Sequence, residues 1–292
     1  MSVRAEGILP SWLKQELPDE AVLEGKRQLR LSKINTVCAD AKCPNLNSCF
    51  KKNSLTFLIL GNACTRNCRF CAVGKAKKSG LPVDTDEPSR IIGLVEKLGL
   101  KYVVITSVTR DDLPDGGASE FVRVIETARH SDKGIKIELL IPDFSGKPFA
   151  LEALVAAAPE VIGHNIETVK RVHGELKPQC SYDLSILVLE KIKKLSPSQI
   201  TKSSIMLGLG EERDEVINTM RDLRGSAVDI LTLGQYLSPG KEYYPVVKFI
   251  EEERFGEYRD IGLSLGFRAV LSGPKVRSSY SAQDLYLEAA NA

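Results

Sequence analysis

The sequence predicts an α/β fold built as a partial (β/α)6 barrel of the TIM type, with an N-terminal extension and a C-terminal tail that closes the mouth. Six short runs rich in β-branched residues recur along the chain, and helical patterns separate them. Such alternation indicates parallel βαβ units, and six strands fit a partial barrel better than a closed eight-stranded one. The 292 residues, 43% of them hydrophobic, supply ample material for the core of such a fold.

The elements are expected in the following order. The predicted strands, which read as covered on both faces, are 55–61, 101–107, 135–141, 161–166, 203–209 and 229–235. The helices between them repeat apolar residues at spacings of three and four, at 88–99, 118–130, 149–158, 183–195 and 214–225. A further helix is expected at 251–266 and a last short strand at 267–273. The predicted domains are an irregular extension at 1–54, the barrel at 55–240, and a C-terminal segment at 241–292.

The composition excludes several classes of protein. Lys and Arg number 40 against 38 Asp and Glu, and this balance argues against a dedicated nucleic-acid or membrane surface. No run is apolar and long enough for a membrane span, and the first 20 residues lack the pattern of a secretory signal or transit peptide. An odd count of 7 cysteines without such a signal predicts a cytoplasmic protein, in which clustered cysteines are metal ligands.

The sharpest motif is CTRNCRFC, which places Cys64, Cys68 and Cys71 directly after the first predicted strand. In a parallel barrel this is the C-terminal mouth, where active sites lie. Three thiolates can hold three irons of a [4Fe–4S] cluster and leave the fourth iron open to a substrate. The alternative, structural zinc, needs a fourth ligand, and the three histidines are distant in the sequence.

A second triad lies in CADAKCPNLNSC, as Cys38, Cys43 and Cys49. A zinc knot or spare buried thiols are the alternatives. A strand and another cysteine triad follow at once, and this context favours a second iron–sulfur cluster.

The first triad, with Phe70 before its last cysteine, resembles the radical S-adenosylmethionine (SAM) superfamily, and both triads together resemble the lipoyl synthase family. Eight segments look like that family in unbroken order: CPN (43–45), TFLILG (56–61), CTRNCRFCAV (64–73), TSVTRDDLPDGGA (106–118), HNIETV (164–169), MLGLGE (206–211), LTLGQYLSP (231–239) and GPKVRSSY (273–280). The resemblance implies two [4Fe–4S] clusters, SAM, and insertion of two sulfur atoms at carbons 6 and 8 of a protein-bound octanoyl-lysine. The auxiliary cluster, held by the second triad, would be the sulfur donor.

The resemblance also implies roles for single residues. Ser279, beside Tyr280, would be the fourth ligand of the auxiliary cluster, whereas a helix cap is the alternative. Contacts to SAM would come from Phe70, Thr106, Ser107, Asn165, Glu167, Arg171, Gly210, Gln235 and Tyr236. For Thr106, Ser107, Asn165 and Glu167, loop capping is the alternative. We expect the aspartates of TRDDLPDGG to order the mouth loop and Cys180 to be a free thiol. After QYLSP the chain departs from the family pattern, with Tyr243 near a usual histidine position and no proline after Phe249.

The implied partners are an octanoylated lipoyl carrier domain and an electron donor such as ferredoxin or flavodoxin. The carrier would be a 2-oxo acid dehydrogenase acyltransferase subunit or the glycine cleavage H-protein, and an iron–sulfur carrier protein is a further candidate. Neither nucleic acid nor membrane is expected, and the protein should be monomeric. Two alternatives stay open: a radical enzyme that thiolates another target such as a tRNA base, and a structural iron–sulfur or zinc protein. The chain after residue 240 is short and weakly basic for an RNA-binding module.

Overall fold

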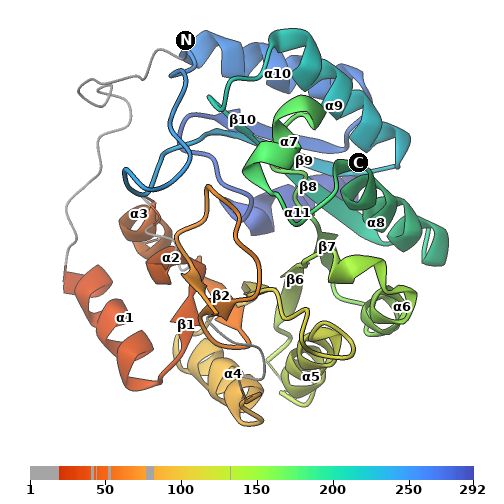
Figure 1. The fold of residues 1–292 in the computed structure, drawn as a ribbon. Helices are drawn as coiled ribbons and strands as arrows, with labels where there is room; N and C mark the ends of the chain where they lie inside the picture. Colours follow the sequence, from red (N-terminus) through yellow and green to blue (C-terminus); the bar gives the residue numbers. More distant parts are fainter. Residues whose placement is uncertain (1–19, 41–42, 44, 52–53, 77–81, 132) are drawn as a thin grey trace. The chain divides into compact units, whose positions relative to one another are not determined.

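A computed structural model describes residues 20–292 except 41–42, 44, 52–53, 77–81 and 132 (Figure 1). The described chain divides into two compact units. The N-terminal unit contains residues 20–66 and 72–162, and the C-terminal unit contains residues 67–71 and 163–292. The boundary therefore passes twice through the first cysteine motif.

The N-terminal unit has a sheet with strand order β1-β2-β5-β6. These strands are β1 (Asn35–Thr36), β2 (Thr56–Ile59), β5 (Tyr102–Ser107) and β6 (Lys136–Leu140). β1 runs antiparallel to β2, while β2, β5 and β6 are parallel. The helices are α1 (Glu20–Leu31), α2 (Val37–Asp40), α3 (Leu46–Lys51), α4 (Glu87–Lys97), α5 (Ala118–Arg129) and α6 (Pro148–Ala156). α5 packs between α4 and α6, and α1 packs against α3 (Figure 1).

The C-terminal unit contains β8 (Ile200–Leu207), β9 (Ile230–Gln235) and β10 (Ala269–Gly273), all parallel, with β9 in the middle. Its helices are α7 (Lys170–Leu176), α8 (Tyr182–Leu195), α9 (Arg213–Gly225), α10 (Glu252–Ser264) and α11 (Ala282–Asn291). The core of this unit joins side chains from α7, α9, α10 and the strands, and Ile205, Met220 and Leu233 within it are fully buried. β7 (Val161–Gly163) lies in the sequence where one unit gives way to the other.

The structure confirms the predicted parallel α/β class, and it contains every predicted strand and helix, with small shifts at their ends. Two expectations about local structure are wrong. The segment before residue 54 is not wholly irregular, because it forms α1, α2, α3 and β1. α7 was not predicted at all. The division into domains at residues 54 and 240 stays a prediction.

The first predicted strand ends two residues early because the chain turns sharply at Leu60 and Gly61. Their φ angles are 67° and 82°, a left-handed conformation that is costly for leucine. The buried Glu87, at the start of α4, accepts the Leu60 N–H at 2.7 Å and so stabilises the turn. Burial raises the pKa of Glu87. The turn directs the chain from β2 into the cysteine motif.

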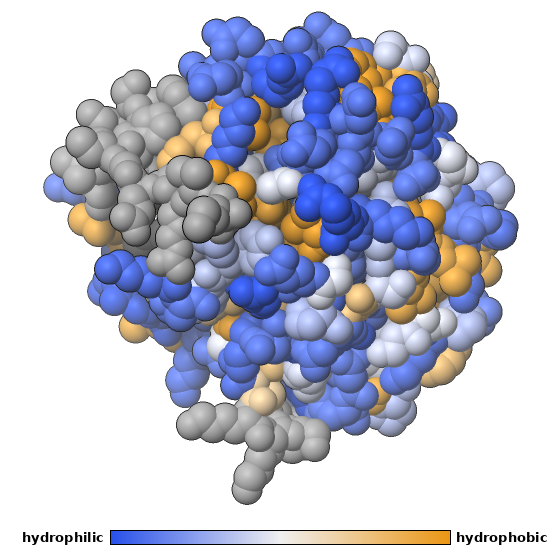
Figure 2. Space-filling model, turned by 45° about the horizontal axis from the view of Figure 1, so that its top comes forward, coloured by the Kyte–Doolittle hydropathy of each residue, from blue (hydrophilic) through white to orange (hydrophobic). Residues whose placement is uncertain are grey.

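Within the described residues, no helix is long and apolar enough to cross a membrane. On the face that Figure 2 shows, hydrophilic side chains surround small hydrophobic patches.

Gly234 in β9 yields a test of packing. A methyl group at this position would lie 1.9 Å from the Val276 carbonyl oxygen, so Gly234→Ala must displace the segment after β10. We expect a loss of about 1–3 kcal/mol in unfolding free energy, as overpacking usually causes. Gly256→Ala in α10 is the matched control, because its methyl group would meet nothing within 4 Å. Thermal unfolding followed by circular dichroism should show a midpoint below that of the original protein for Gly234→Ala but not for Gly256→Ala. A midpoint of Gly234→Ala equal to that of the original protein would contradict the close approach.

Candidate active site

The cysteine motif starts from a short two-stranded sheet in the N-terminal unit. β3 (Ala63–Cys64) pairs in parallel with β4 (Gly74–Lys75), and the Ala76 N–H donates to the Cys64 carbonyl oxygen at 2.8 Å. The backbone N–H of Arg66 points to the Cys64 sulfur at 3.4 Å.

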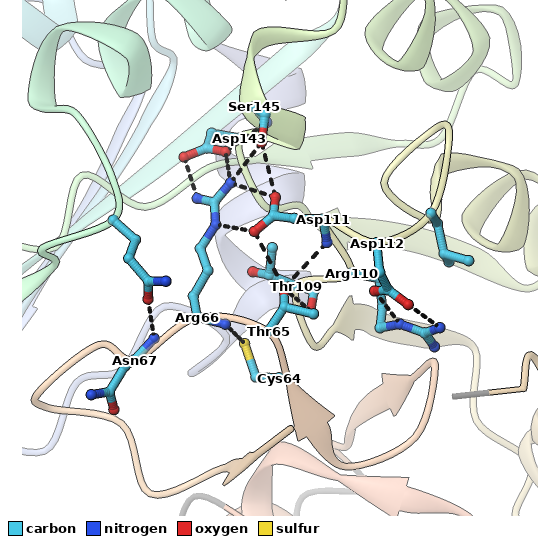
Figure 3. A network of polar contacts seen from close by, with 12 residues as sticks. Cys64, Thr65, Arg66, Asn67, Thr109, Arg110, Asp111, Asp112, Asp143 and Ser145 are labelled. Carbon is cyan, nitrogen blue, oxygen red and sulfur yellow. Dashed lines mark hydrogen bonds and ion pairs between the residues drawn. The ribbon is translucent and has the colours of Figure 1, made fainter. Parts of the chain in front are cut away.

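The two residues after Cys64 join the motif to the loop after β5 (Figure 3). Thr65 donates its N–H and its hydroxyl to the Thr109 carbonyl oxygen, each at 3.0 Å. The guanidinium of Arg66 forms ion pairs with Asp111 and Asp143, at 2.8 and 2.6 Å. The hydrogen bonds from Arg66 hold the pKa of Asp111 below its ordinary value. The expectation that aspartates order this loop therefore has a structural basis at Asp111.

Residues 67–71 are bound within the C-terminal unit. The Asn67 N–H donates to the Gln179 side chain at 2.5 Å, and the Arg69 N–H donates to the Leu176 carbonyl oxygen at 2.9 Å. Phe70 packs against the core of the unit. The segment that carries Cys68 and Cys71 is therefore fixed by main-chain contacts to the end of α7 and the loop after it.

Cys180 lies against Cys68, and their side chains are hydrogen bonded. This hydrogen bond is the largest cause of the raised pKa of Cys68, and burial is the second. Cys68 therefore keeps its proton when no metal is bound, and an iron must displace that proton on binding. Cys180 forms no disulfide, as expected, but sequence reasoning did not place it beside a proposed ligand.

The other triad lies wholly in the N-terminal unit. The Cys43 N–H donates to the Cys38 carbonyl oxygen at 3.2 Å, and α3 carries Cys49. Burial raises the pKa of Cys38 to about 12, and the nearby Cys43 and Cys49 add to this shift. None of these three described cysteines forms a disulfide. Three thiols, two of which lie near enough to Cys38 to raise its pKa, are soft donors that fit an iron–sulfur cluster.

Among the described residues, no three His, Cys, Asp or Glu side chains converge on a position for a single metal ion. The cysteine ligands of a [4Fe–4S] cluster bind separate irons, so they need not converge on one point.

Four predicted SAM contacts lie where strands end. In the N-terminal unit, the Thr106 hydroxyl donates to the Leu140 carbonyl oxygen at 2.7 Å, while the buried Ser107 hydroxyl has no partner in the described structure. In the C-terminal unit, the side-chain oxygen of Asn165 is likewise buried and unpaired. Glu167 has a φ of 71°, and burial raises its pKa. Buried polar groups normally have partners, so the unpaired atoms of Ser107 and Asn165 suit a polar ligand.

The other predicted SAM contacts are engaged within the protein. Arg171 is exposed, pairs with Glu215 at 2.8 Å and donates to the Gly210 carbonyl oxygen at 2.7 Å. The buried Tyr236 donates to the Tyr244 carbonyl oxygen at 2.7 Å, and burial raises the pKa of Tyr236 to about 12. These roles toward SAM stay predictions.

In the part of the chain that the structure describes, the hydrogen bonds of the Gln235 side chain go to main-chain atoms. Its amide nitrogen, with two N–H donors, lies 3.0–3.1 Å from the carbonyl oxygens of Leu207, Tyr236 and Lys248, and its oxygen accepts the Ile250 N–H at 2.8 Å. The side chain is 1% exposed. Gln235 therefore ties residues 248 and 250 to the ends of β8 and β9.

Ser279 lies in the turn that precedes α11, in the C-terminal unit. The N-cap of α11 is Ser281, and no side chain caps that helix. Ser279 is half-buried, and its hydroxyl has no hydrogen bond among the described residues. The helix-cap alternative is thus not what the structure shows, and the ligand role stays a prediction.

Comparison with known proteins identifies the family. Residues 58–223 match the model of the radical SAM superfamily. A lipoyl synthase of Caldicellulosiruptor bescii is 47% identical over 276 residues, which are 94% of either chain. The chain belongs to the lipoyl synthase family. A second lipoyl synthase, from Desulfotalea psychrophila, is 48% identical over 96% of this chain and 93% of its own.

The fold agrees with that family. The crystal structure of HydG, a maturase of the [FeFe]-hydrogenase, matches with a TM-score of 0.60 at 13% identity, over 80% of this chain and 54% of HydG. As a member of the lipoyl synthase family, the protein is a radical SAM enzyme that inserts sulfur. The superfamily implies one [4Fe–4S] cluster and SAM.

Sequence reasoning missed Asp143, Gln179 and Cys180. A signal existed for Asp143, because it follows the third predicted strand, where polar residues of an α/β fold meet ligands. Gln179 and Cys180 follow α7, which was itself not predicted.

Gln235 can be tested apart from catalysis. In Gln235→Leu the amides of Val247, Lys248 and Ile250 should exchange hydrogen at least about tenfold faster, because the segment loses its anchor. Gln199→Leu replaces another buried glutamine of the same unit and should leave these amides unchanged. Hydrogen exchange measured by mass spectrometry tests this expectation. If Gln235→Leu instead shows normal exchange but weaker SAM binding, the result would support the prediction that Gln235 contacts SAM.

Proposed function

We propose that this protein converts the octanoyl-lysine of a lipoyl carrier domain to lipoyl-lysine, by inserting sulfur at carbons 6 and 8. The observation that supports this most is the pair of separate cysteine triads in a chain of the lipoyl synthase family. The target C–H bonds carry no acidic proton, so acid–base catalysis cannot activate them. A carbon radical can abstract these hydrogens, and a nearby sulfur source can supply the sulfur for the new carbon–sulfur bonds.

Cys64, Cys68 and Cys71 would hold the cluster that binds SAM. With SAM, that cluster supplies a carbon radical that abstracts hydrogen from unactivated C–H bonds. The protein orients the bound molecule and excludes water. Ser107 and Asn165 have buried atoms without partners among the described residues, and these atoms suit this binding. The other members of the proposed set are Phe70, Thr106, Glu167, Arg171, Gly210, Gln235 and Tyr236.

Cys38, Cys43, Cys49 and Ser279 would hold the auxiliary cluster, which is the sulfur source. The proximity of Cys43 and Cys49 to Cys38, whose pKa both raise, supports a shared metal centre. Serine oxygen is a less usual partner for iron than thiolate, so a cluster that gives up its sulfur benefits from this ligand. The unpaired hydroxyl of Ser279 is consistent with that role.

The partners follow from the reaction. The carrier would be the lipoyl domain of a 2-oxo acid dehydrogenase acyltransferase subunit or the glycine cleavage H-protein. Ferredoxin or flavodoxin would supply electrons, and an iron–sulfur carrier protein would restore the auxiliary cluster. An anaerobic assay with an octanoyl-lysine peptide tests the proposal, because thiolated products differ in mass, and their absence despite SAM cleavage would exclude this substrate.

Replacing one cysteine of each triad should separate the two clusters. Cys68→Ala should abolish formation of 5′-deoxyadenosine and lose roughly half the iron, if two equal clusters are present. Cys43→Ala should still cleave SAM but form no carbon–sulfur bond. Cys180→Ser is the control, since it changes a neighbouring thiol outside both triads, and it should keep all the iron. Undiminished SAM cleavage by Cys68→Ala, or lipoyl product from Cys43→Ala, would refute the respective role.

Ser279 and Ser278 allow a comparison of adjacent serines. Ser279→Ala should still abstract hydrogen, but sulfur insertion should be impaired because the auxiliary cluster is held abnormally. Ser278→Ala should matter less. Anaerobic assays that measure 5′-deoxyadenosine and thiolated peptide together make this distinction. Equal loss in both variants would point to a structural role for the turn, and full product from Ser279→Ala would remove it from the ligand set.

A further inference from the structure

Arg66 stands in the sequence between two proposed cluster ligands, Cys64 and Cys68. It is 6% exposed and directs its donors at two carboxylates (Figure 3). Nε and Nη2 bond Asp111 at 2.8 and 2.9 Å, while Nη1 and Nη2 bond Asp143, both at 2.6 Å. Both contacts are bidentate, the geometry that a planar guanidinium provides and an ammonium group does not.

The two carboxylates come from different loops. Asp111 lies in the loop after β5, and Asp143 lies in the loop after β6. Ser145 joins these loops directly, because its hydroxyl donates to Asp111 at 2.9 Å and accepts from Arg66 at 3.2 Å. Arg66 therefore binds the cysteine loop to the carboxyl ends of two neighbouring parallel strands, where the active site of such a sheet lies.

The loops that Arg66 joins have little freedom of their own. Phe144 and Ser145 have φ angles of 48° and 52°, in the left-handed region. Asp143 is 2% exposed, and it also accepts the Ser145 N–H at 2.9 Å. A methyl group on Gly116 would lie 2.9 Å from the ring of Phe144, so the two loops are in close contact. The aspartates are thus fixed points, and the cysteine loop is what Arg66 positions.

Charge makes this arrangement obligatory. Asp143 is buried, and its carboxylate forms an ion pair with the guanidinium of Arg66. Removing one partner of a buried pair leaves an uncompensated charge, which costs much more than the pair contributes. The loop that carries Cys64 therefore has one favoured position in this unit, whether or not iron is bound.

We propose that Arg66 is a positioning residue, which fixes the loop carrying Cys64 against Asp111 and Asp143 and so sets the position of the cluster for SAM cleavage. This rests on the proposed role of Cys64 as a ligand, but not on the octanoyl substrate or on the auxiliary cluster.

The test compares Arg66→Lys, Arg66→Gln and the double variant Arg66→Gln/Asp143→Asn, as full chains reconstituted anaerobically. The readouts are SAM cleavage without octanoyl substrate, iron content, and the electron paramagnetic resonance signal of the reduced protein with and without SAM. The double variant leaves no buried unpaired charge, so it should fold as the original does. Arg90→Gln is the control, since it removes an exposed ion pair with Asp84 in the same unit.

A misplaced cluster loop should lower the cleavage rate of the Gln variant and the double variant by about 100-fold, the order expected for a 1 Å displacement of a reacting group. Both should keep their iron but lose the change in the resonance signal that SAM causes. Arg66→Lys should regain only part of the rate, and Arg90→Gln should match the original protein.

Two results would overturn the proposal. Normal cleavage by Arg66→Lys and the double variant would show that bidentate contact is not needed. Loss of iron and secondary structure in every Arg66 variant would make Arg66 a residue of general stability. The proposed function fails differently: the original protein would cleave SAM yet form no lipoyl product, and the comparison of Arg66 variants would keep its meaning.

Discussion

The buried guanidinium of Arg66 between two carboxylates is the contact on which the arrangement of the cysteine loop in the N-terminal unit depends. Arg66 forms ion pairs with Asp111 in the loop after β5 and with Asp143 in the loop after β6. Ser145 joins these two loops, because its hydroxyl donates to Asp111. Leu60 and Glu87 fix the turn before the loop by a second buried contact. The short segment with Cys64 is thus constrained on both sides by polar groups withdrawn from water, whose contacts are costly to break.

Two of the proposed ligands, Cys38 and Cys68, have raised pKa values and hold their protons more tightly than an ordinary thiol. Burial raises the pKa of Cys38, and the hydrogen bond to Cys180 together with burial raises that of Cys68. Metal binding must release these protons, so loading of each site is coupled to proton loss. Backbone groups contact two of the sulfur atoms that would bind iron: the Arg66 N–H points to that of Cys64, and the backbone of Thr56 is hydrogen bonded to that of Cys38. The polypeptide therefore fixes the ligand-bearing segments before any metal arrives.

The strands and the cysteine triads could be predicted from the sequence because their signals are local. Short runs of β-branched residues indicate buried parallel strands, and the spacing of the cysteines indicates the two triads. The helices α1, α2, α3 and α7 were not predicted. α7 is short and begins at Lys170, and the side chain of its N-cap, Val169, makes no capping hydrogen bond, while α1 packs against α3. The pairing of Arg66 in the cysteine loop with Asp143 could not be predicted from the sequence either. Asp143 lies 77 residues from Arg66, and no local pattern pairs two residues so far apart.

The anchoring of residues 248 and 250 by Gln235 has a consequence for how this segment can evolve. The amide contacts main-chain atoms of residues 248 and 250, and the Gly208 carbonyl oxygen accepts the N–H of Val247, so these contacts do not depend on the side chains of the segment. The exposed side chain of Lys248 can therefore change without loss of this anchor, whereas Val247 and Ile250 also pack against the core. A proline at position 250 would remove the amide hydrogen that Gln235 accepts, so the anchor itself restricts which residues this position tolerates.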